Sequence, residues 1–479
     1  MIKAPAPVRG PSRPPGHRVT PRGRAAFSVI AAAAAVFRLA GIGSKPGWQW
    51  DEVVYAEVAS NLLHHGVPYE RIPLGQPFAP DAYQPAAYFW VLAGWFRVAG
   101  AGVAQGRILG VLCSLAALSL IAAAVYRVYG QRAALVTAAA MAVDGWLVFA
   151  ERIGYIENFL LLVIAAFIVS YGRRRIVLAA ALAGAAFAVK YTGIIAPATF
   201  FIAWLIAGRD HRRHLAGAAA MAGAFAAVTA VTVVTDGWDD WSQSTIVQVR
   251  RVLGAQSSGG TLTSPAAALH LMAAQYWVFL PSLAVAAAGA VILARLAWSC
   301  YRARDWEPAR ADAVFAAWGA AGLLIMAASS LRFPQYFALT LIPLYVLAWS
   351  RAARLQSPAR RAAAAAVLLA SVGSVALRVA VPGDNVLASV RQYAAASLPA
   401  GAVVVADEQV GDEIAQPYCR EQDAAPCLGR ASYVITWDTY LQQTQALGDP
   451  AFSVIFASRR KVASWAGWNG TVTVWKVTP

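Results

Sequence analysis

Two adjacent carboxylates, Asp51 and Glu52, follow the first hydrophobic segment of the chain. Ionised groups beside hydrocarbon are costly and are usually retained for function. A carboxylate there can act as a general base that takes the proton of an attacking hydroxyl group. The structural alternative is a helix N-cap followed by a first-turn acid, which the helix dipole favours and which does not exclude catalysis. We interpret this acidic pair as the best candidate for a catalytic centre.

The composition places these acids in a membrane protein. Of the 479 residues, 59% are hydrophobic and 13% are charged, which leaves too little polar surface for a soluble domain. The net charge of +16 does not indicate a nucleic-acid partner, because basic clusters occupy short gaps between apolar segments. These clusters lie at residues 3–24, 127–132, 173–175, 209–213, 302–310 and 351–361. We therefore predict a polytopic α-helical protein that follows the positive-inside rule.

The apolar runs predict about eleven transmembrane helices. They lie near residues 24–42, 105–126, 133–150, 156–171, 176–189, 191–207, 214–235, 272–298, 312–330, 334–350 and 362–380. A further run, Pro85 to Ala99, decides the topology, because all basic clusters share one side only if this run lies in the interface or re-enters. We take that interpretation, with the N-terminus in the cytoplasm and the C-terminus outside. Arg38 interrupts the first segment, which we read as a retained anchor and not a signal peptide.

This topology gathers acids and isolated cations on the outer face. They lie in the loop from residue 43 to about residue 107, in the turn at residues 151–158, at Lys190, in the loop from residue 236 to about residue 270 and in the segment 331–334. Residues 51–65 predict an amphipathic helix along the membrane surface. Glu157 could approach the site from its turn, or pair with Arg152 instead. The inner face carries mainly arginine, so we expect the chemistry outside.

Other polar groups have more ordinary interpretations. Asp236, Asp239 and Asp240 are typical of a solvated loop after a transmembrane helix. The adjacent His64 and His65 are more typical of polar surface than of metal ligands. A divalent metal stays possible, because suitable acids are present, although no ligand spacing requires one.

The order of several short motifs carries a resemblance. The motifs are Trp50-Asp51-Glu52 with Tyr55-Ala56, Tyr83-Gln84-Pro85, Arg107, Arg152 to Glu157, Lys190-Tyr191-Thr192-Gly193, and Arg332-Phe333-Pro334-Gln335-Tyr336-Phe337. Over about residues 20–350 they resemble the large membrane glycosyltransferases of the C-type fold, such as the protein O-mannosyltransferases and the lipid A aminoarabinose transferases. Gln84, Glu157 and Gln335 depart from the residues usual in those relatives, which leaves donor and acceptor identity open.

The resemblance implies transfer of a sugar from a polyprenyl-phosphate carrier to an acceptor outside the cytoplasm, with inversion at the anomeric carbon. A lipid phosphate is a good leaving group, so one carboxylate base suffices, whereas glycoside hydrolases need a second carboxyl group. Lys190 and Arg332, and then Arg107, are expected to neutralise the departing phosphate. Their structural alternatives are snorkelling for Lys190 and Arg332, and packing or topology for Arg107. With this reaction, Asp51 is the candidate base, while Glu52 could orient it, bind the acceptor or help hold a cation. The residues expected to contact substrate are Tyr55, Tyr83 and Gln84.

The partners implied are a lipid-linked sugar, the bilayer, and a lipid, cell-wall glycan or protein acceptor. High alanine and arginine content indicates a GC-rich, bacterial source, so an undecaprenyl- or decaprenyl-type carrier is expected in the plasma membrane. The sugar itself is not determined.

Residues 381–479 predict a small extracytoplasmic α/β domain, and residues 1–23 a disordered basic tail in the cytoplasm. The domain has a predicted helix at 385–398, strand-like runs at 403–406, 433–436, 452–456 and 471–477, and a helix-like run at 438–447. Cys419 and Cys427 could form a disulfide outside the cell, whereas Cys113 and Cys300 are expected to be free.

Two other classes of function remain as alternatives. A transporter or lipid flippase predicts acids near mid-span and broken helices in matching halves. Here the acids cluster at outer helix ends, with Asp144 as the main exception, so we favour the transferase. A non-catalytic envelope scaffold built around the C-terminal domain would not require Asp51.

Overall fold

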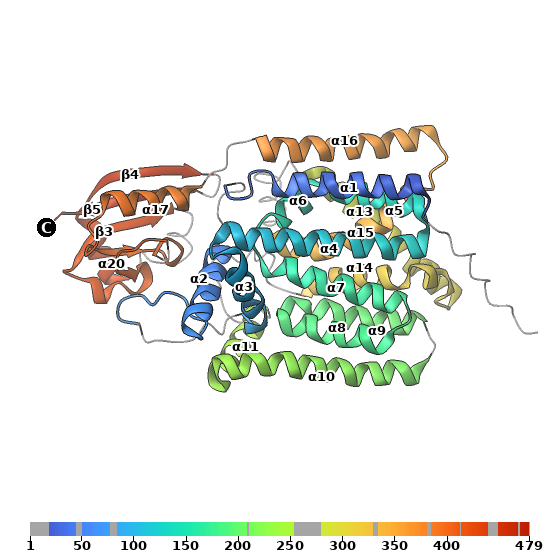
Figure 1. Cartoon of the computed structure of the whole chain (residues 1–479), viewed down its shortest axis with the longest axis horizontal. Helices are drawn as coiled ribbons and strands as arrows, with labels where there is room; N and C mark the ends of the chain where they lie inside the picture. Colours follow the sequence, from blue (N-terminus) through green and yellow to red (C-terminus); the bar gives the residue numbers. More distant parts are fainter. Residues whose placement is uncertain are drawn as a thin grey trace, which may run out of the picture.

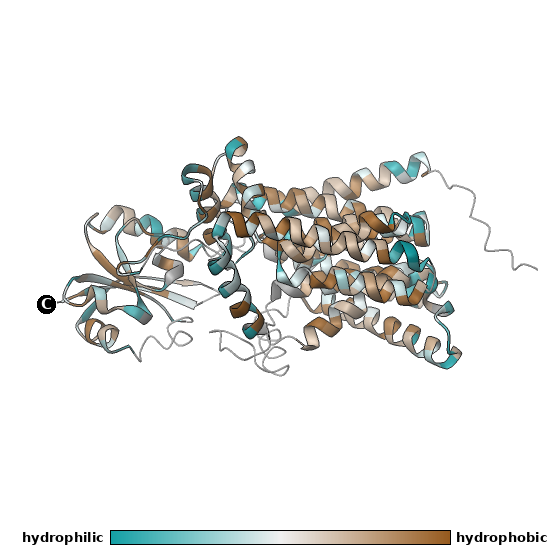
Figure 2. Ribbon diagram, turned by 90° about the horizontal axis from the view of Figure 1, so that it is seen from below, coloured by the Kyte–Doolittle hydropathy of each residue, from teal (hydrophilic) through white to brown (hydrophobic). Residues whose placement is uncertain are grey.

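Apolar helices form a bundle, and a small sheet domain stands at one end of it (Figure 1). The computed structural model describes residues 19–44, 50–76, 84–207, 210–252, 279–328, 334–380, 385–411, 413–438, 449–467 and 470–478. The residues of the bundle helices are largely apolar along most of each helix, and hydrophilic residues concentrate at the ends of the bundle (Figure 2). This distribution is the one a bilayer requires.

Each of the eleven segments predicted to cross the membrane contains a helix. They are α1 (Pro21–Leu39), α4 (Val103–Tyr129), α5 (Gln131–Ala142) with α6 (Gly145–Glu151), α7 (Ile156–Gly172), α8 (Ile176–Val189), η1 (Tyr191–Ile194) with α9 (Ile195–Ala207), α10 (His211–Asp236), α13 (Leu280–Ala303), α14 (Ala313–Ala328), α15 (Pro334–Ala352) and α16 (Pro358–Ala380). Within the described residues, five helices are long and apolar enough to cross a membrane, or six if the bent pair α5–α6 counts as one. The others are shorter or, like α1, carry three arginines within a span-length window, so a total of eleven is not established.

The break between α5 and α6 explains the acid at mid-span. The two helices meet at an angle of 63°. Asp144 caps α6, because its Oδ1 accepts a hydrogen bond from the Leu147 N–H at 2.9 Å and its Oδ2 accepts one from the Ser282 hydroxyl at 2.8 Å. Asp144 therefore accepts a backbone N–H at the start of α6 and connects this helix to α13. Its role in the structure is to stabilise the break between the two helices.

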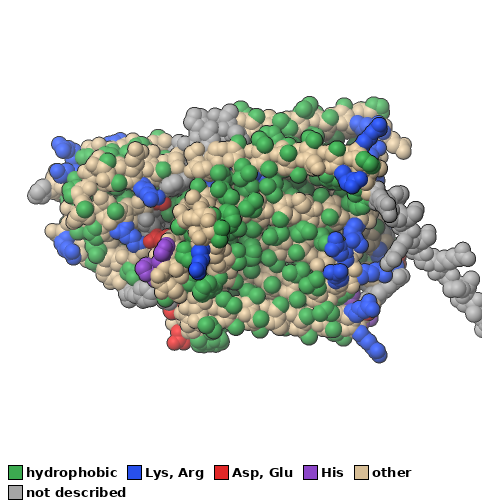
Figure 3. Space-filling view, in the orientation of Figure 1, with side chains coloured by type: hydrophobic (Ala, Val, Ile, Leu, Met, Phe, Trp, Pro, Cys, Tyr) green, Lys and Arg blue, Asp and Glu red, His purple; other side chains and the backbone are tan. Residues whose placement is uncertain are grey.

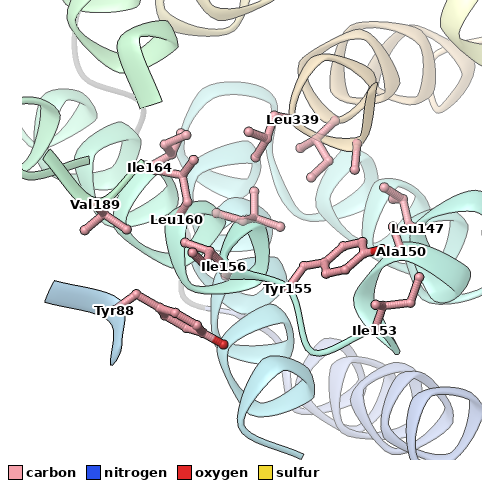
Figure 4. Close-up of a cluster of buried hydrophobic side chains, with 14 of the residues drawn as sticks. Tyr88, Leu147, Ala150, Ile153, Tyr155, Ile156, Leu160, Ile164, Val189 and Leu339 are labelled. Atoms are coloured by element: carbon pink, nitrogen blue, oxygen red, sulfur yellow. The ribbon is translucent and has the colours of Figure 1, made fainter. Parts of the chain in front are cut away.

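Small residues let the bundle helices approach closely. A side chain at Gly184 of α8 would collide with the backbone of Met221 in α10, so glycine permits this contact. Side chains from α6, α7, α8 and α15 meet in one buried cluster that includes Leu147, Leu160 and Val189 (Figure 4). Tyr88 and Tyr155 border the same cluster.

The two ends of the bundle differ in charge. Lys and Arg side chains gather at the end opposite the sheet domain, which we call the basic end (Figure 3). Within the described residues, the predicted basic clusters lie there, at turns such as the one between α7 and α8 that carries Arg173, Arg174 and Arg175. The opposite end, next to the sheet domain, is called the sheet-domain end.

Two further helices lie across the sheet-domain end. They are α2 (Trp50–His65) and α3 (Ala86–Ala99), and both run at a steep angle to the bundle axis (Figure 1). The α3 helix contacts α2, α4 and α10. This arrangement agrees with the expectation that the Pro85 to Ala99 run does not simply cross the bilayer.

The sheet domain has five strands in the order β2-β1-β3-β5-β4. They are β1 (Val403–Ala406), β2 (Tyr418–Arg420), β3 (Ala431–Trp437), β4 (Arg459–Gly467) and β5 (Gly470–Val477). The β1 strand pairs in parallel with β2 and β3, whereas β5 pairs antiparallel with β3 and β4. The α17 helix (Val386–Ser397) precedes the sheet, α18 (Glu408–Gly411) follows β1, and Cys419 and Cys427 form a disulfide.

Two predictions about local structure were wrong. The strand-like run at 452–456 lies in helix α20 (Pro450–Ala457), because Asp449 caps the helix through the Phe452 N–H at 2.8 Å and Pro450 occupies its first turn. The expected loop after Asp236 begins instead as helix α11 (Trp238–Val252). Most of the helix-like run at 438–447 lies outside the described residues, as do residues 272–278 of the eighth predicted transmembrane segment.

Candidate active site

Glu52 anchors the start of α2 to two other elements. Its side chain is buried, and its carboxylate accepts hydrogen bonds from Arg107 Nε at 2.8 Å and from the Gly154 backbone N–H at 2.9 Å. A second guanidinium nitrogen of Arg107 donates to Glu52 Oε1. The pair therefore joins the first turn of α2 to the start of α4 and to the turn before α7.

This geometry changes the expected role of Arg107. Its side chain is 0% exposed, and its remaining terminal nitrogen donates to the Ile42 carbonyl at 2.9 Å. A guanidinium enclosed in this way holds Glu52 and the backbone near α1, and it offers no exposed surface to a donor phosphate. Arg107 is thus the packing residue that the sequence left as its alternative.

Asp51 remains the more accessible of the two neighbouring acids. It stands in the first turn of α2 and is partly exposed, whereas Glu52 is 2% exposed. Adjacent residues on a helix point about 100° apart, so one acid can turn inward while the other faces the surface. The structure therefore separates the pair into an anchor and a candidate base.

A second acid and cation pair lies at the same end of the bundle. Lys190 Nζ donates to Glu157 Oε1 at 2.7 Å, and both side chains are nearly buried. Glu157 opens α7, while Lys190 occupies the extended residue between α8 and η1. Glu157 therefore pairs with Lys190 and not with Arg152, which donates to the Phe37 and Ala40 carbonyls at 2.6 Å each.

The Tyr88 side chain contacts the same turn that the Glu52 carboxylate contacts. Its hydroxyl donates to the Gly154 carbonyl at 3.3 Å, so Gly154 is held by α2 through its N–H and by α3 through its carbonyl. Burial raises the pKa of Tyr88, and the nearby Cys113, Glu157 and Glu52 raise it further. The hydroxyl accordingly stays protonated and donates to Gly154.

Tyr55 belongs to the packing beneath this surface. Its ring is 2% exposed and meets the rings of Tyr88 at 5.9 Å, Phe89 at 5.8 Å and Tyr155 at 6.5 Å, all edge to face. A ring enclosed by three others has little surface left for a substrate. The expected substrate contact at Tyr55 is therefore replaced by a role in fixing α2 against α3.

The other predicted site residues are placed as follows. Gln84 is partly exposed directly before α3, whose first N–H, that of Ala86, donates to the Thr232 hydroxyl at 3.1 Å. Tyr83 and Arg332 lie outside the described residues. In the described part of the chain, no group of three or more His, Cys, Asp or Glu side chains could hold a metal ion.

Sequence reasoning missed the residues that join this site to the sheet domain. Arg71 in the loop after α2 donates to carbonyls of the sheet domain, and Glu57 of α2 lies beside it. Neither lies in a distinctive motif, and the carbonyl partners of Arg71 lie more than 300 positions away along the chain. Gly154 was likewise quoted within a motif, but nothing in its sequence context predicts a contact with Glu52.

The model of glycosyltransferase family 87 matches residues 82–330, which is more than half of the chain. No curated protein sequence matches the chain.

Solved structures share the arrangement of helices and sheet. ArnT from Cupriavidus metallidurans bound to undecaprenyl phosphate is similar with a TM-score of 0.61 and 18% identity, over 96% of this chain and 99% of that one. The same protein in the apo state gives a TM-score of 0.62 at 17% identity, over 95% and 98% of the two chains. The archaeal oligosaccharyltransferase AglB from Archaeoglobus fulgidus, in complex with an inhibitory peptide and a dolichol-phosphate, gives 0.57 at 12% identity over 95% and 74%.

Proposed function

The chain belongs to glycosyltransferase family 87 and has the C-type membrane fold, and from this premise we propose a reaction and assign its residues. We propose that it transfers a sugar from a polyprenyl-phosphate donor to an acceptor hydroxyl outside the cytoplasm, with inversion at the anomeric carbon. The observation that carries the proposal is the position of Asp51, a partly exposed carboxylate held by the Glu52 anchor within the same end of the bundle as Lys190.

The chemistry of the donor sets the requirements of the site. Asp51 takes the proton of the acceptor hydroxyl, and the hydroxyl oxygen forms a bond with the anomeric carbon from the face opposite the lipid phosphate. The bond between that carbon and the phosphate oxygen breaks, and its electrons leave with the phosphate. Because a phosphate needs no proton to depart, the reaction needs a single carboxylate base and no carboxylic acid to protonate the leaving group.

Lys190 is the proposed partner of the departing phosphate. A cation in a poorly hydrated site stabilises the charge that develops on the leaving oxygen. Glu157 accepts a hydrogen bond from the ammonium group at 2.7 Å and so holds the cation at this end of the bundle. Arg332 is proposed as a second phosphate contact, and Tyr83 and Gln84 as substrate contacts, on the strength of the motifs alone.

The difference in charge between the two ends of the bundle supports a reaction outside the cytoplasm. Basic residues mark one end, and the positive-inside rule assigns that end to the cytoplasm of a plasma membrane. The sheet domain, its disulfide and α2 lie at the other end. The proposed reaction therefore takes place outside, on a lipid, glycan or protein acceptor.

A transfer assay tests this proposal. Wild-type protein and Asp51→Asn would be purified and supplied with polyprenyl-phosphate sugars, and transfer to membrane lipid, glycan and peptide acceptors would be measured. General-base catalysis contributes about 10²- to 10⁴-fold, so the variant should lose at least about a hundredfold in rate. Asp239→Asn is the matched control, because Asp239 is an exposed acid in the first turn of α11.

Equal activity of wild type and Asp51→Asn would remove the base assignment. Absence of turnover in the wild type with every polyprenyl-phosphate sugar would remove the proposed donor class.

A further inference from the structure

The loop that follows α2 is bound to the sheet domain through one side chain. Arg71 Nη2 donates to the Ala415 carbonyl at 3.0 Å and to the Gln416 carbonyl at 2.8 Å. Its Nη1 donates to the carbonyls of Ile414 and, at 3.4 Å, Gly411. One guanidinium thus donates to four carbonyls: that of Gly411 at the end of α18, and those of Ile414, Ala415 and Gln416 in the turn that leads to β2. We call the described residues 411 and 413–416 the docking turn.

Neighbouring contacts reinforce the same junction. The Leu74 N–H donates to the Tyr418 carbonyl at 2.7 Å, so the loop pairs with the start of β2 through its backbone. The Arg71 guanidinium also lies 5.7 Å from the centre of the Tyr418 ring. Further along the loop, the Gln76 side chain donates to the Asp423 carboxylate.

The junction reaches back to α2 along two routes. Asn61 in α2 donates to the Tyr69 carbonyl at 2.7 Å, which folds the loop onto the end of the helix. The Arg71 backbone N–H donates to the Glu57 carboxylate, two turns into the helix from its start. In addition, α18 of the sheet domain contacts α2 directly.

The helix is therefore fixed at two separated places. Its first turn is held to the bundle by the Glu52 and Arg107 pair, and its second half is held to the sheet domain through Arg71. A rigid helix fixed at both ends presents its side chains in one orientation, whereas a helix fixed at one end can pivot. Asp51 stands on this helix, so its direction depends on both attachments.

We propose that Arg71 is a positioning residue for sugar transfer, which acts by docking the sheet domain onto the loop after α2 and thereby fixing α2 and Asp51. On this proposal, full transferase activity requires the sheet domain to be docked. This inference rests on the proposed function only for its kinetic consequence, since the docking itself is a property of the fold.

The first measurement is hydrogen exchange on the full-length protein in detergent, with no substrate present. In Arg71→Ala the hydrogen-bonded backbone amides of the junction, those of Leu74, Gln76, Glu413 and Ile414, should exchange at least about tenfold faster. The reason is that hydrogen bonds from a charged donor contribute more than neutral ones, so the junction opens more often without them. The amides of β3 and β5 should be unchanged. Arg430→Ala, which removes an exposed arginine of the same domain, is the matched control and should match the wild type.

The second measurement is steady-state transfer by the same variants. Misdirecting Asp51 removes an interaction made in the transition state, so Arg71→Ala should lower kcat by roughly tenfold and leave the KM of the lipid donor within about twofold. Arg71→Lys should give intermediate exchange and intermediate kcat, because a single ammonium nitrogen cannot span the docking turn. If Arg71→Ala does not fold, the exchange rates and kcat of Arg71→Lys test the proposal in its place.

Two outcomes would overturn the inference. Unchanged exchange in both Arg71 variants would show that the side chain does not hold the junction. Faster exchange with wild-type kcat would show that docking does not position the base. If the wild type turns over no polyprenyl-phosphate sugar, the proposed donor is wrong, and the exchange rates still decide by themselves whether Arg71 docks the sheet domain.

Discussion

Glu52 and Arg107 form a buried, two-pronged ion pair that fastens the first turn of α2 to α4. Because this pair occupies the inner acid, the neighbouring Asp51 is left as the acid that faces the surface. The relationship divides two adjacent carboxylates into an anchor and a proposed base, and it leads to tests of stability and activity that differ for the two residues.

Breaking the anchor should destabilise the whole protein. Arg107→Met leaves the Glu52 carboxylate buried without its cation, and losing one partner of a buried pair costs about 3–5 kcal/mol. Thermal unfolding in detergent would measure the loss. Glu307→Gln is the control, since its exposed pair with Arg310 contributes about 0–1 kcal/mol.

The double variant Glu52→Gln with Arg107→Met sharpens this test. It should be less destabilised than the sum of the single variants, because neither charge is left alone. Strict additivity would contradict the assignment of the two residues as a pair.

Lys190 should matter for the lipid donor. Replacing it with methionine keeps much of its length but removes the charge, so kcat/KM for the polyprenyl-phosphate sugar should fall by roughly ten- to a hundredfold. Lys476→Met, on the exposed side of β5, is the control. A less stable Lys190→Met protein with wild-type donor kinetics would assign Lys190 to its ion pair with Glu157 alone.

The interface between α2 and the sheet domain should be sensitive to pH. Burial raises the pKa of Glu57 to about 7, against the lowering effect of Arg71. Burial likewise raises the pKa of Glu413 to about 7, with Arg391 lowering it and Glu57 and Glu52 raising it further. The folded protein therefore binds more protons than the unfolded chain between the ordinary value of 4.5 and about 7.

Stability linked to these two acids should be greatest below pH about 4.5 and should be lost as the pH rises to about 7, above which it levels off. The double variant Glu57→Gln with Glu413→Gln should remove this slope from a series of Tm measurements across that range. Asp210→Asn, an exposed acid at the basic end, should keep it. A wild-type protein whose Tm does not fall over this window would contradict the prediction.

Reduction of the disulfide should destabilise the sheet domain. Cys419 and Cys427 are eight positions apart, and cross-linking a loop of that length contributes about 2.5 kcal/mol in the chain-entropy account. Dithiothreitol should therefore lower the Tm of the wild type but not that of Cys419→Ala with Cys427→Ala. Cys113→Ala is the control, because Cys113 is free and buried in α4, and it should respond to reductant like the wild type.

The broad architecture could be predicted because a membrane-spanning helix is marked by a continuous apolar segment, which is a local property of the sequence. Apolar runs bounded by arginine located the helices to within a few residues, as with the run at 176–189, which coincides with α8. Isolated strands were harder, because a short apolar run such as Phe452 to Phe456 suits a strand or a helix, and a capping aspartate and a proline decided it.

The sequence by itself determined that this is a membrane glycosyltransferase of the C-type fold and that Asp51, Glu52, Glu157 and Lys190 are its notable polar residues. Only the tertiary structure decided their partners: Glu52 with Arg107, Glu157 with Lys190, and Arg71 with a turn some 340 positions away. The reason is physical. Apolar periodicity is a short-range property that survives in the linear chain, whereas an ion pair depends on which helix ends meet in space, and no local pattern encodes that meeting.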